Sequence, residues 1–181
     1  IASVEKELPL NHYLRYEACL QSNDPDCLKV FSSMIRSELP FETYQEIGGW
    51  YEAINCTEEA LHLFSLASDH PIALYRSAFI LNQLGKEADA KEMLKKAELL
   101  SPDFVFPFRS EELNALEWAV SETNSWKSRY YTALLYWSLG NKDQALNLLN
   151  KCNESSYAPL YLCRAMLKSG QDKLADIQKA E

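Results

Sequence analysis

The residues best suited to acid–base or metal chemistry are three histidines, His12, His62 and His70. They lie far apart in the sequence, and none has an Asp, Cys or Ser at the spacing of a catalytic triad or a metal site. His70 directly precedes Pro71, which indicates a turn residue. No glycine-rich phosphate loop or paired-carboxylate motif is present. The sequence therefore predicts a protein without catalysis of its own and without a metal or organic cofactor.

Cysteine thiols are the other reactive groups, and five are present: Cys19, Cys27, Cys56, Cys152 and Cys163. An odd number without a C-x-x-C pair is typical neither of a disulfide framework nor of a zinc site. We interpret all five as unpaired, buried hydrophobic residues in a reducing compartment. With no signal peptide evident at the first residues, this favours a cytoplasmic location. Glycosylation triplets at Asn55 and Asn153 then carry no function.

Charge and composition limit the classes of partner. The 181 residues include 18 Lys and Arg and 26 Asp and Glu, a net charge of −8. Nucleic acids and anionic membranes attract clustered Lys and Arg, so we expect neither nucleic-acid binding nor membrane insertion. Only 5 Gly and 7 Pro interrupt the apolar periodic runs, and 47% of the residues are hydrophobic. This composition predicts an all-α protein built from long helices.

Residues 71–102 have the clearest periodicity. Apolar and small residues recur at helical spacing on two successive segments, as Leu74, Ala78 and Leu81 and then as Ala90, Leu94 and Ala97. Gly85 separates the two segments, and Pro102 ends the second. Small side chains at Ala78 and Ala90 allow two antiparallel helices to approach closely where they cross. The stretch is therefore predicted to form a helical hairpin.

This stretch resembles the tetratricopeptide repeat family, whose unit of about 34 residues has large, small, aromatic and proline positions in the same order. It departs from that pattern at Ser77, where a large apolar residue is usual, and at Leu81 and Leu94, where aromatics are usual. The resemblance implies a right-handed α-α superhelix, a solenoid of helical hairpins, here with eleven helices. It also implies a protein–protein interaction scaffold that binds a protein or peptide segment.

The resemblance divides the chain into four parts. Residues 1–40 are predicted to form an N-terminal hairpin that is a degenerate or capping repeat, and residues 41–102 two repeats. Residues 103–125 form an insertion with an extra helix, because the equivalent small positions Ala78 and Ala133 lie 55 residues apart. Residues 126–181 hold two more repeats, of which the last is shortened.

First helices of such hairpins form the concave wall of a solenoid, where partners bind. On this wall we expect eight partner-binding residues: Tyr75, Phe79, Asn82, Lys127, Tyr130, Leu134, Trp137 and Arg164. The aromatic ones either form an open apolar groove or pack as core against the rings of Phe104, Phe106 and Phe108. The Lys, Asn and Arg clamp with which some members bind a C-terminal carboxylate is not matched by Gln45, Gly49, Tyr75, Phe79, Tyr130 and Leu134.

Two segments, residues 101–117 and 126–140, also resemble the C-terminal repeat region of large bacterial multidomain proteins that carry a β-sandwich domain in front. That resemblance implies a different role, in which the chain is an accessory module that positions a catalytic or carbohydrate-binding domain of the same parent chain. An exposed concave wall would favour the free scaffold, whereas a covered wall would favour the accessory module.

Overall fold

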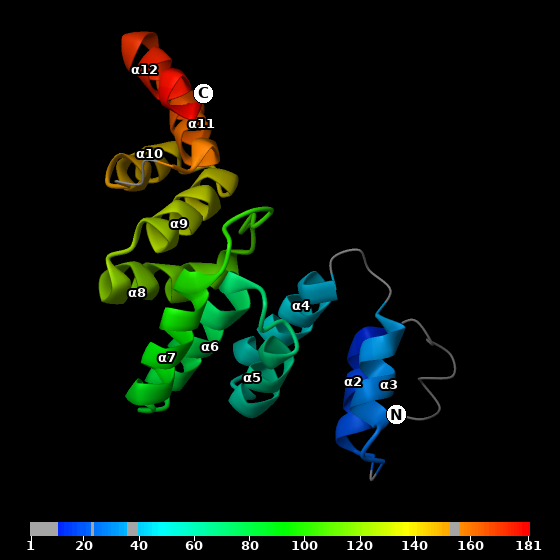
Figure 1. Ribbon diagram of the computed structural model, residues 1–181. Helices are drawn as coiled ribbons and strands as arrows, with labels where there is room; N and C mark the ends of the chain where they lie inside the picture. The colour runs from blue at the N-terminus through cyan, green and yellow to red at the C-terminus, as the bar shows by residue number, and fades with distance from the viewer. Residues whose placement is uncertain (1–10, 23, 36–39, 153–155) are drawn as a thin grey trace. The chain divides into compact units, whose positions relative to one another are not determined.

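The computed structural model describes residues 11–22, 24–35, 40–152 and 156–181, and the regular structure within these ranges is all helical, as predicted (Figure 1). Eleven α-helices and one short 3-10 helix follow in order over the described residues: α2 His12–Leu20, α3 Cys27–Met34, α4 Pro40–Ala53, α5 Thr57–Ser65, α6 Pro71–Gln83, α7 Glu87–Leu99, η1 Ser110–Glu112, α8 Leu113–Thr123, α9 Trp126–Ser138, α10 Lys142–Asn150, α11 Ala158–Leu167 and α12 Gly170–Ala180. None of these helices has the length and apolar character that crossing a membrane requires.

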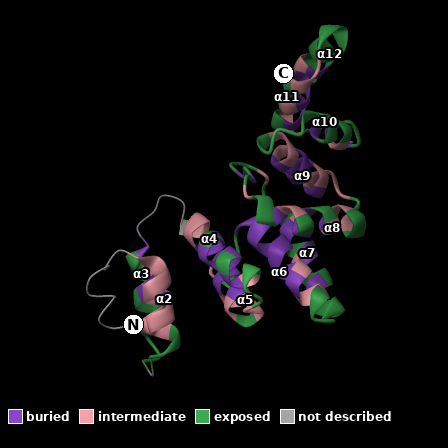
Figure 2. Cartoon of the chain, turned by 180° about the vertical axis from the view of Figure 1, so that it is seen from behind, coloured by how far each residue is buried: buried purple, intermediate pink, exposed green. Residues whose placement is uncertain are grey.

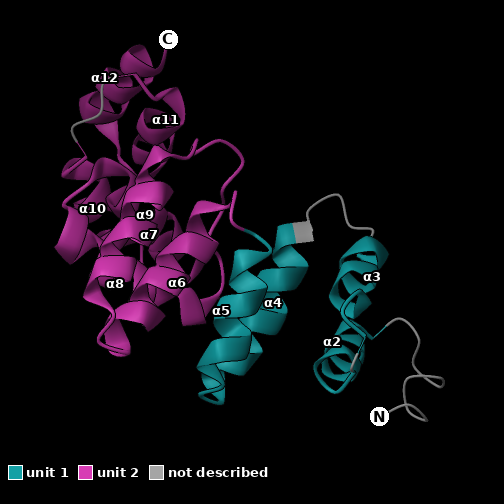
Figure 3. Cartoon of the chain, turned by 60° about the horizontal axis from the view of Figure 1, so that its bottom comes forward, with its two compact units in different colours: residues 1–67 teal, residues 68–181 magenta. Residues whose placement is uncertain are grey.

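The chain divides into two compact units, residues 1–67 and residues 68–181 (Figure 3). Unit 1 holds the helix pairs α2 with α3 and α4 with α5. Aromatic rings form its core: Tyr16 lies with its ring centroid 5.5 Å from those of both Phe31 and Tyr51. The Tyr16 hydroxyl also lies 2.9 Å from Nδ1 of His62 on α5. Tyr16 therefore joins α2 to α3, α4 and α5.

Phe64 on α5 lies directly against Gly48 on α4. A Cβ atom placed on Gly48 would come within 2.5 Å of the Phe64 ring, which is fully buried. The Phe64 ring therefore requires a glycine at position 48.

The cysteine prediction was wrong about pairing for two of the five residues, and wrong about burial for all except Cys152. Cys19 and Cys27 form a disulfide across the turn between α2 and α3, with their Cα atoms 5.4 Å apart. Cys56, Cys152 and Cys163 are free thiols. Because the cytoplasmic expectation rested on unpaired cysteines, the disulfide removes that premise.

Residues 24–26 precede α3, which begins at Cys27. The Asp24 carboxylate accepts a hydrogen bond from the backbone N–H of Asp26, which closes a local turn ahead of the helix.

Unit 2 consists of successive neighbouring helices, in which α6 packs on α7 and α8, α9 on α8 and α10, and α11 on α10 and α12. Small residues occupy the crossing points: Ala78 and Ala133 are fully buried, and Ala90 is nearly so. Figure 2 shows α6 as an almost continuously buried helix. The predicted face of the central hairpin is thus confirmed for these residues.

A buried ion pair stabilises the last hairpin. Arg164 on α11 donates two hydrogen bonds, of 2.9 and 2.6 Å, to the carboxylate of Asp176 on α12. Lys168 lies 2.9 Å from the same carboxylate. Burial by itself raises the pKa of Asp176, but the hydrogen bonds from Arg164 and Lys168 outweigh it and lower the pKa below the ordinary value.

Candidate functional site

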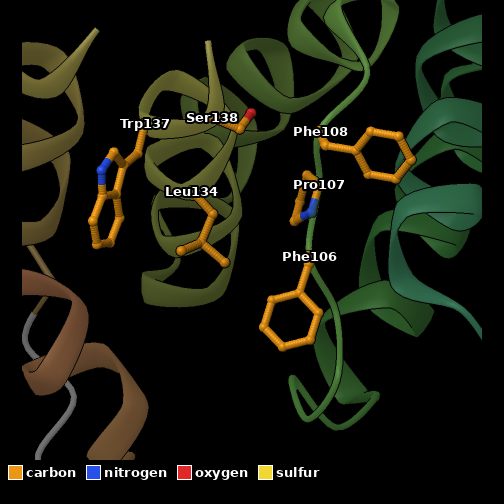
Figure 4. A pocket seen from close by; sticks show the side chains of 6 residues that line it. All are labelled: Phe106, Pro107, Phe108, Leu134, Trp137 and Ser138. Carbon is orange, nitrogen blue, oxygen red and sulfur yellow. The ribbon is translucent and has the colours of Figure 1, made fainter. Parts of the chain in front are cut away.

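An apolar groove of about 370 Å³ lies on unit 2, between the inserted segment and α9. It is lined by Phe106, Pro107, Phe108, Leu134, Trp137 and Ser138. Figure 4 shows the Phe106 ring on the side of the inserted segment that faces Leu134, whereas the Phe108 ring turns to the opposite side. We call Phe106, Pro107 and Phe108 the aromatic wall of this groove.

The inserted segment exposes its rings because alternate residues hold it in place. Val105 and Pro107 are buried, and Val105 belongs to the same core as Tyr75 and Tyr131. The intervening rings are exposed, with 84% of Phe104, 67% of Phe106 and 53% of Phe108 accessible. The rings of Phe104, Phe106 and Phe108 therefore do not cover the concave aromatics. Tyr75 and Tyr130 are nevertheless core residues, in a buried cluster that includes Val105.

Two of the eight predicted partner-binding residues line the groove, namely Leu134 and Trp137. Both are partly exposed side chains of α9. Ser138, on the last turn of α9, joins them there, although its type gave no signal in the sequence. A contiguous apolar surface of this kind marks an interaction site more often than isolated exposed residues do.

Tyr75 and Tyr130, by contrast, are buried in the core of unit 2. The Tyr75 hydroxyl donates a 2.7 Å hydrogen bond to the carboxylate of Glu98 on α7, and burial raises the pKa of Tyr75. Tyr130 lies 5.6 Å from Tyr157, centroid to centroid, in an edge-on arrangement. These two tyrosines support the groove from beneath and do not line it.

The two predicted basic residues are held by intramolecular partners. Lys127 donates 2.6 Å hydrogen bonds from Nζ to the backbone carbonyls of Glu98 and Leu100, at the end of α7. Arg164 is bonded to Asp176, as described above. Both side chains therefore have structural partners in unit 2.

Phe79 and Asn82 lie on a different surface of the unit, beside α8. The ring of Phe79 packs 5.8 Å from that of Trp118, and Asn82 lines a second, more polar pocket that also includes Trp118. That pocket adjoins Glu87 and Glu122. The eight residues predicted as one surface are thus distributed over the groove, the core and this second pocket.

Glu112 anchors the end of the aromatic wall. It is 1% exposed, and its Oε2 accepts a hydrogen bond from the backbone N–H of Arg109, while its own N–H donates to the Arg109 carbonyl. The Arg109 guanidinium lies 3.7 Å from the other carboxylate oxygen and 4.3 Å from the centre of the Phe108 ring.

The electrostatics of Glu112 are unusual for an acid. Burial raises its pKa to about 7, although the positive charges of Arg76 and Arg109 and the hydrogen bond from the Arg109 N–H act in the opposite direction. Arg76 belongs to α6 and is fully buried. Glu112 therefore changes its charge near neutral pH at a position that joins the wall to the core.

Among the described residues, no group of His, Cys, Asp and Glu is arranged to hold a metal ion. The groove itself contains one hydroxyl, from Ser138, and otherwise apolar side chains. Such a lining can bind apolar side chains of a partner but provides no nucleophile paired with a base.

Comparison with protein-family models gives two matches in this unit, both described as tetratricopeptide repeat, over residues 72–104 and residues 127–155. The chain contains tetratricopeptide repeats. The first match spans α6 and α7, and the second spans α9 and α10, so the groove lies where the insertion meets the second repeat. Neither the search of curated proteins nor the search of solved structures finds a match. Tetratricopeptide repeats are in general protein–protein interaction modules and are typically non-catalytic.

Proposed function

We propose that this protein is a non-catalytic interaction scaffold that binds an apolar peptide segment of a partner protein in the groove between the aromatic wall and α9. The observation that supports this proposal is the exposed ring of Phe106 on the side that faces Leu134, in a groove that Trp137 also lines. Large aromatic side chains contribute most of the binding energy at protein interfaces when a partner removes them from water.

The charge distribution is consistent with an apolar partner. Residues 68–181 contain 14 Lys and Arg and 15 Asp and Glu, so unit 2 is close to neutral. Electrostatic attraction therefore adds little selectivity to this surface, and shape and apolar contact remain the means of recognition. We expect preferred peptides to carry large apolar residues at the positions that contact Leu134 and Trp137.

The experiment is a selection of peptides from a random displayed library on the full chain, followed by titration of the winning peptide. Phe106→Ser and Trp137→Ala should each weaken binding at least tenfold, because each removes an apolar contact from the groove. Phe104→Ser is the matched control: its ring is exposed but does not line the groove, so its affinity should match that of the wild type.

Circular dichroism checks that each variant keeps its helices. If the selected peptides bind Phe106→Ser and Trp137→Ala as tightly as they bind the wild type, this groove is not the binding site. If they lose binding to Phe104→Ser alone, the exposed end of the inserted segment is the site instead.

A further inference from the structure

A series of interactions links the core of unit 2 to the segment that carries the aromatic wall. It begins at the buried guanidinium of Arg76 on α6, whose charge acts on the carboxylate of Glu112. Glu112 pairs with Arg109 through both its side chain and its backbone. The guanidinium of Arg109 lies over the ring of Phe108, the last residue of the aromatic wall. Val105 and Pro107 are buried side chains of the same segment.

We infer that Glu112 is a positioning residue for the groove, and that its ionised form holds the aromatic wall more firmly than its protonated form. This inference rests on the proposed function of the groove. The ionised carboxylate attracts the Arg109 guanidinium and strengthens the bond that it accepts from the Arg109 N–H, because bonds to charged acceptors are the stronger ones. Protonation removes that attraction, so the wall is then held less firmly.

The charged groups that act on Glu112 are Arg76 from α6, and Arg109 and Glu111 from its own segment. Glu112 is the group among them whose charge changes near neutral pH. Since burial raises its pKa to about 7, ionisation occurs between about pH 6 and pH 8. The groove is therefore expected to bind its peptide more tightly at pH 8 than at pH 6.

The raised pKa of Glu112 also affects folding stability, and there ionisation is unfavourable. A carboxyl whose pKa is higher in the folded state than in the unfolded chain binds its proton more tightly when folded. Its contribution to stability is present below its ordinary pKa of 4.5 and is lost as the pH rises to about 7. Ionised Glu112 thus costs stability while it orders the groove, which is the pattern expected of a functional rather than a purely structural acid.

The test is an NMR titration of the full chain that follows the Arg109 amide and the backbone dynamics of Phe106 and Phe108. In the wild type, the Arg109 amide shift should change with a midpoint near pH 7, and the wall should become more mobile below it. In Glu112→Gln, which keeps the size and the acceptor oxygen, the transition should be absent. Glu111→Gln is the matched control and should keep it, because Glu111 is exposed.

His70 is the one histidine in unit 2, so His70→Gln is a second control. In the His70→Gln variant, the pH transition of the Arg109 amide should be unchanged. In the wild type, affinity for the selected peptide should fall about fivefold from pH 8 to pH 6, which is the lower end of the usual coupling between two sites. In Glu112→Gln the affinity should be the same at both pH values.

An Arg109 amide that does not titrate near pH 7 would overturn the inference, and so would a titration that leaves peptide affinity unchanged. Either result leaves the proposed function intact when the groove variants still lose the peptide. If the groove variants keep the peptide, the proposed function fails, and the NMR titration still reports on Glu112 because it needs no partner.

Discussion

Both units contain buried rings and small residues, but the disulfide lies in unit 1, where Tyr16 lies at the centre of an aromatic cluster. In unit 1 the ring of Tyr16 contacts three other helices, and Cys19 and Cys27 close one hairpin covalently. In unit 2 the crossing points are alanines such as Ala78 and Ala133. Both family matches fall in unit 2. A repeat pattern therefore permits close backbone packing, and the unit that lacks a detected repeat has a cross-link in addition.

The charges differ in the same way. Residues 1–67 contain 4 Lys and Arg against 11 Asp and Glu, so nearly all of the net charge of −8 lies in unit 1. Like charges in a small unit repel one another, which adds to the need for a stabilising cross-link. Unit 2, which carries the groove, is close to neutral and lacks this repulsion.

The largest expected effect is that of Tyr16→Ala. Removing a fully buried ring costs about 4 kcal/mol of the free energy of unfolding, and here the loss reaches three neighbouring helices. Residue-specific NMR in denaturant should show the signals of residues 11–67 disappearing first, while unit 2 remains folded. Trp50→Ala, at a ring that is 48% exposed, serves as control and should have a small effect. Simultaneous loss of both units would show that they fold as one.

The second largest effect is expected for Arg164→Met, which breaks the buried ion pair of unit 2. It leaves the carboxylate of Asp176 buried without its main partner, which costs about 3 kcal/mol. The double variant Arg164→Met, Asp176→Leu should recover most of that loss, because no charge then remains buried. Thermal unfolding of the three proteins measures this, and a double variant no more stable than the single one would contradict a role for the ion pair.

The disulfide should have an intermediate effect, confined to unit 1. Its cysteines are 8 residues apart, and a loop of that size contributes about 2–3 kcal/mol in the chain-entropy model. Cys19→Ser with Cys27→Ser should therefore lower the unfolding midpoint of unit 1 alone. Cys152→Ser with Cys163→Ser is the matched control for unit 2, and thiol titration before and after reduction counts the bridged pair.

Two glycine substitutions should produce the smallest effects, for different reasons. Gly48→Ala places a methyl group against the Phe64 ring and costs about 1–3 kcal/mol by overpacking. Gly85→Ala meets open space, but Gly85 has a φ of +73°, so the cost is about 1 kcal/mol of backbone strain. Phe64→Leu should reduce the cost of Gly48→Ala and leave that of Gly85→Ala unchanged.

The sequence was sufficient to predict the hairpin over residues 71–102, because the spacing of Leu74, Ala78, Ala90 and Leu94 depends only on helix geometry. It was insufficient for the disulfide. The pairing of Cys19 with Cys27 depends on the tight turn between α2 and α3, and a count of cysteines contains no information on that distance.

The groove was predictable only in part. Leu134 and Trp137 follow from their place on a first helix of a repeat, whereas Phe106 and Phe108 were as consistent with a core as with a surface. Their exposure depends on which residues of an extended segment face inward. Val105 and Pro107 face inward. Composition alone does not indicate whether these residues or the phenylalanines between them face the core.

Side chains across the insertion join the end of the first matched repeat to the second. Lys127 binds the carbonyls of Glu98 and Leu100, and the hydroxyl of Tyr157 donates a 3.2 Å hydrogen bond to the carbonyl of Pro102. The repeats are therefore attached to each other by contacts that bypass the inserted segment. A protease that cut the backbone between Phe104 and Phe106 would leave two fragments still associated, so covalent continuity through the insertion is dispensable for the stack.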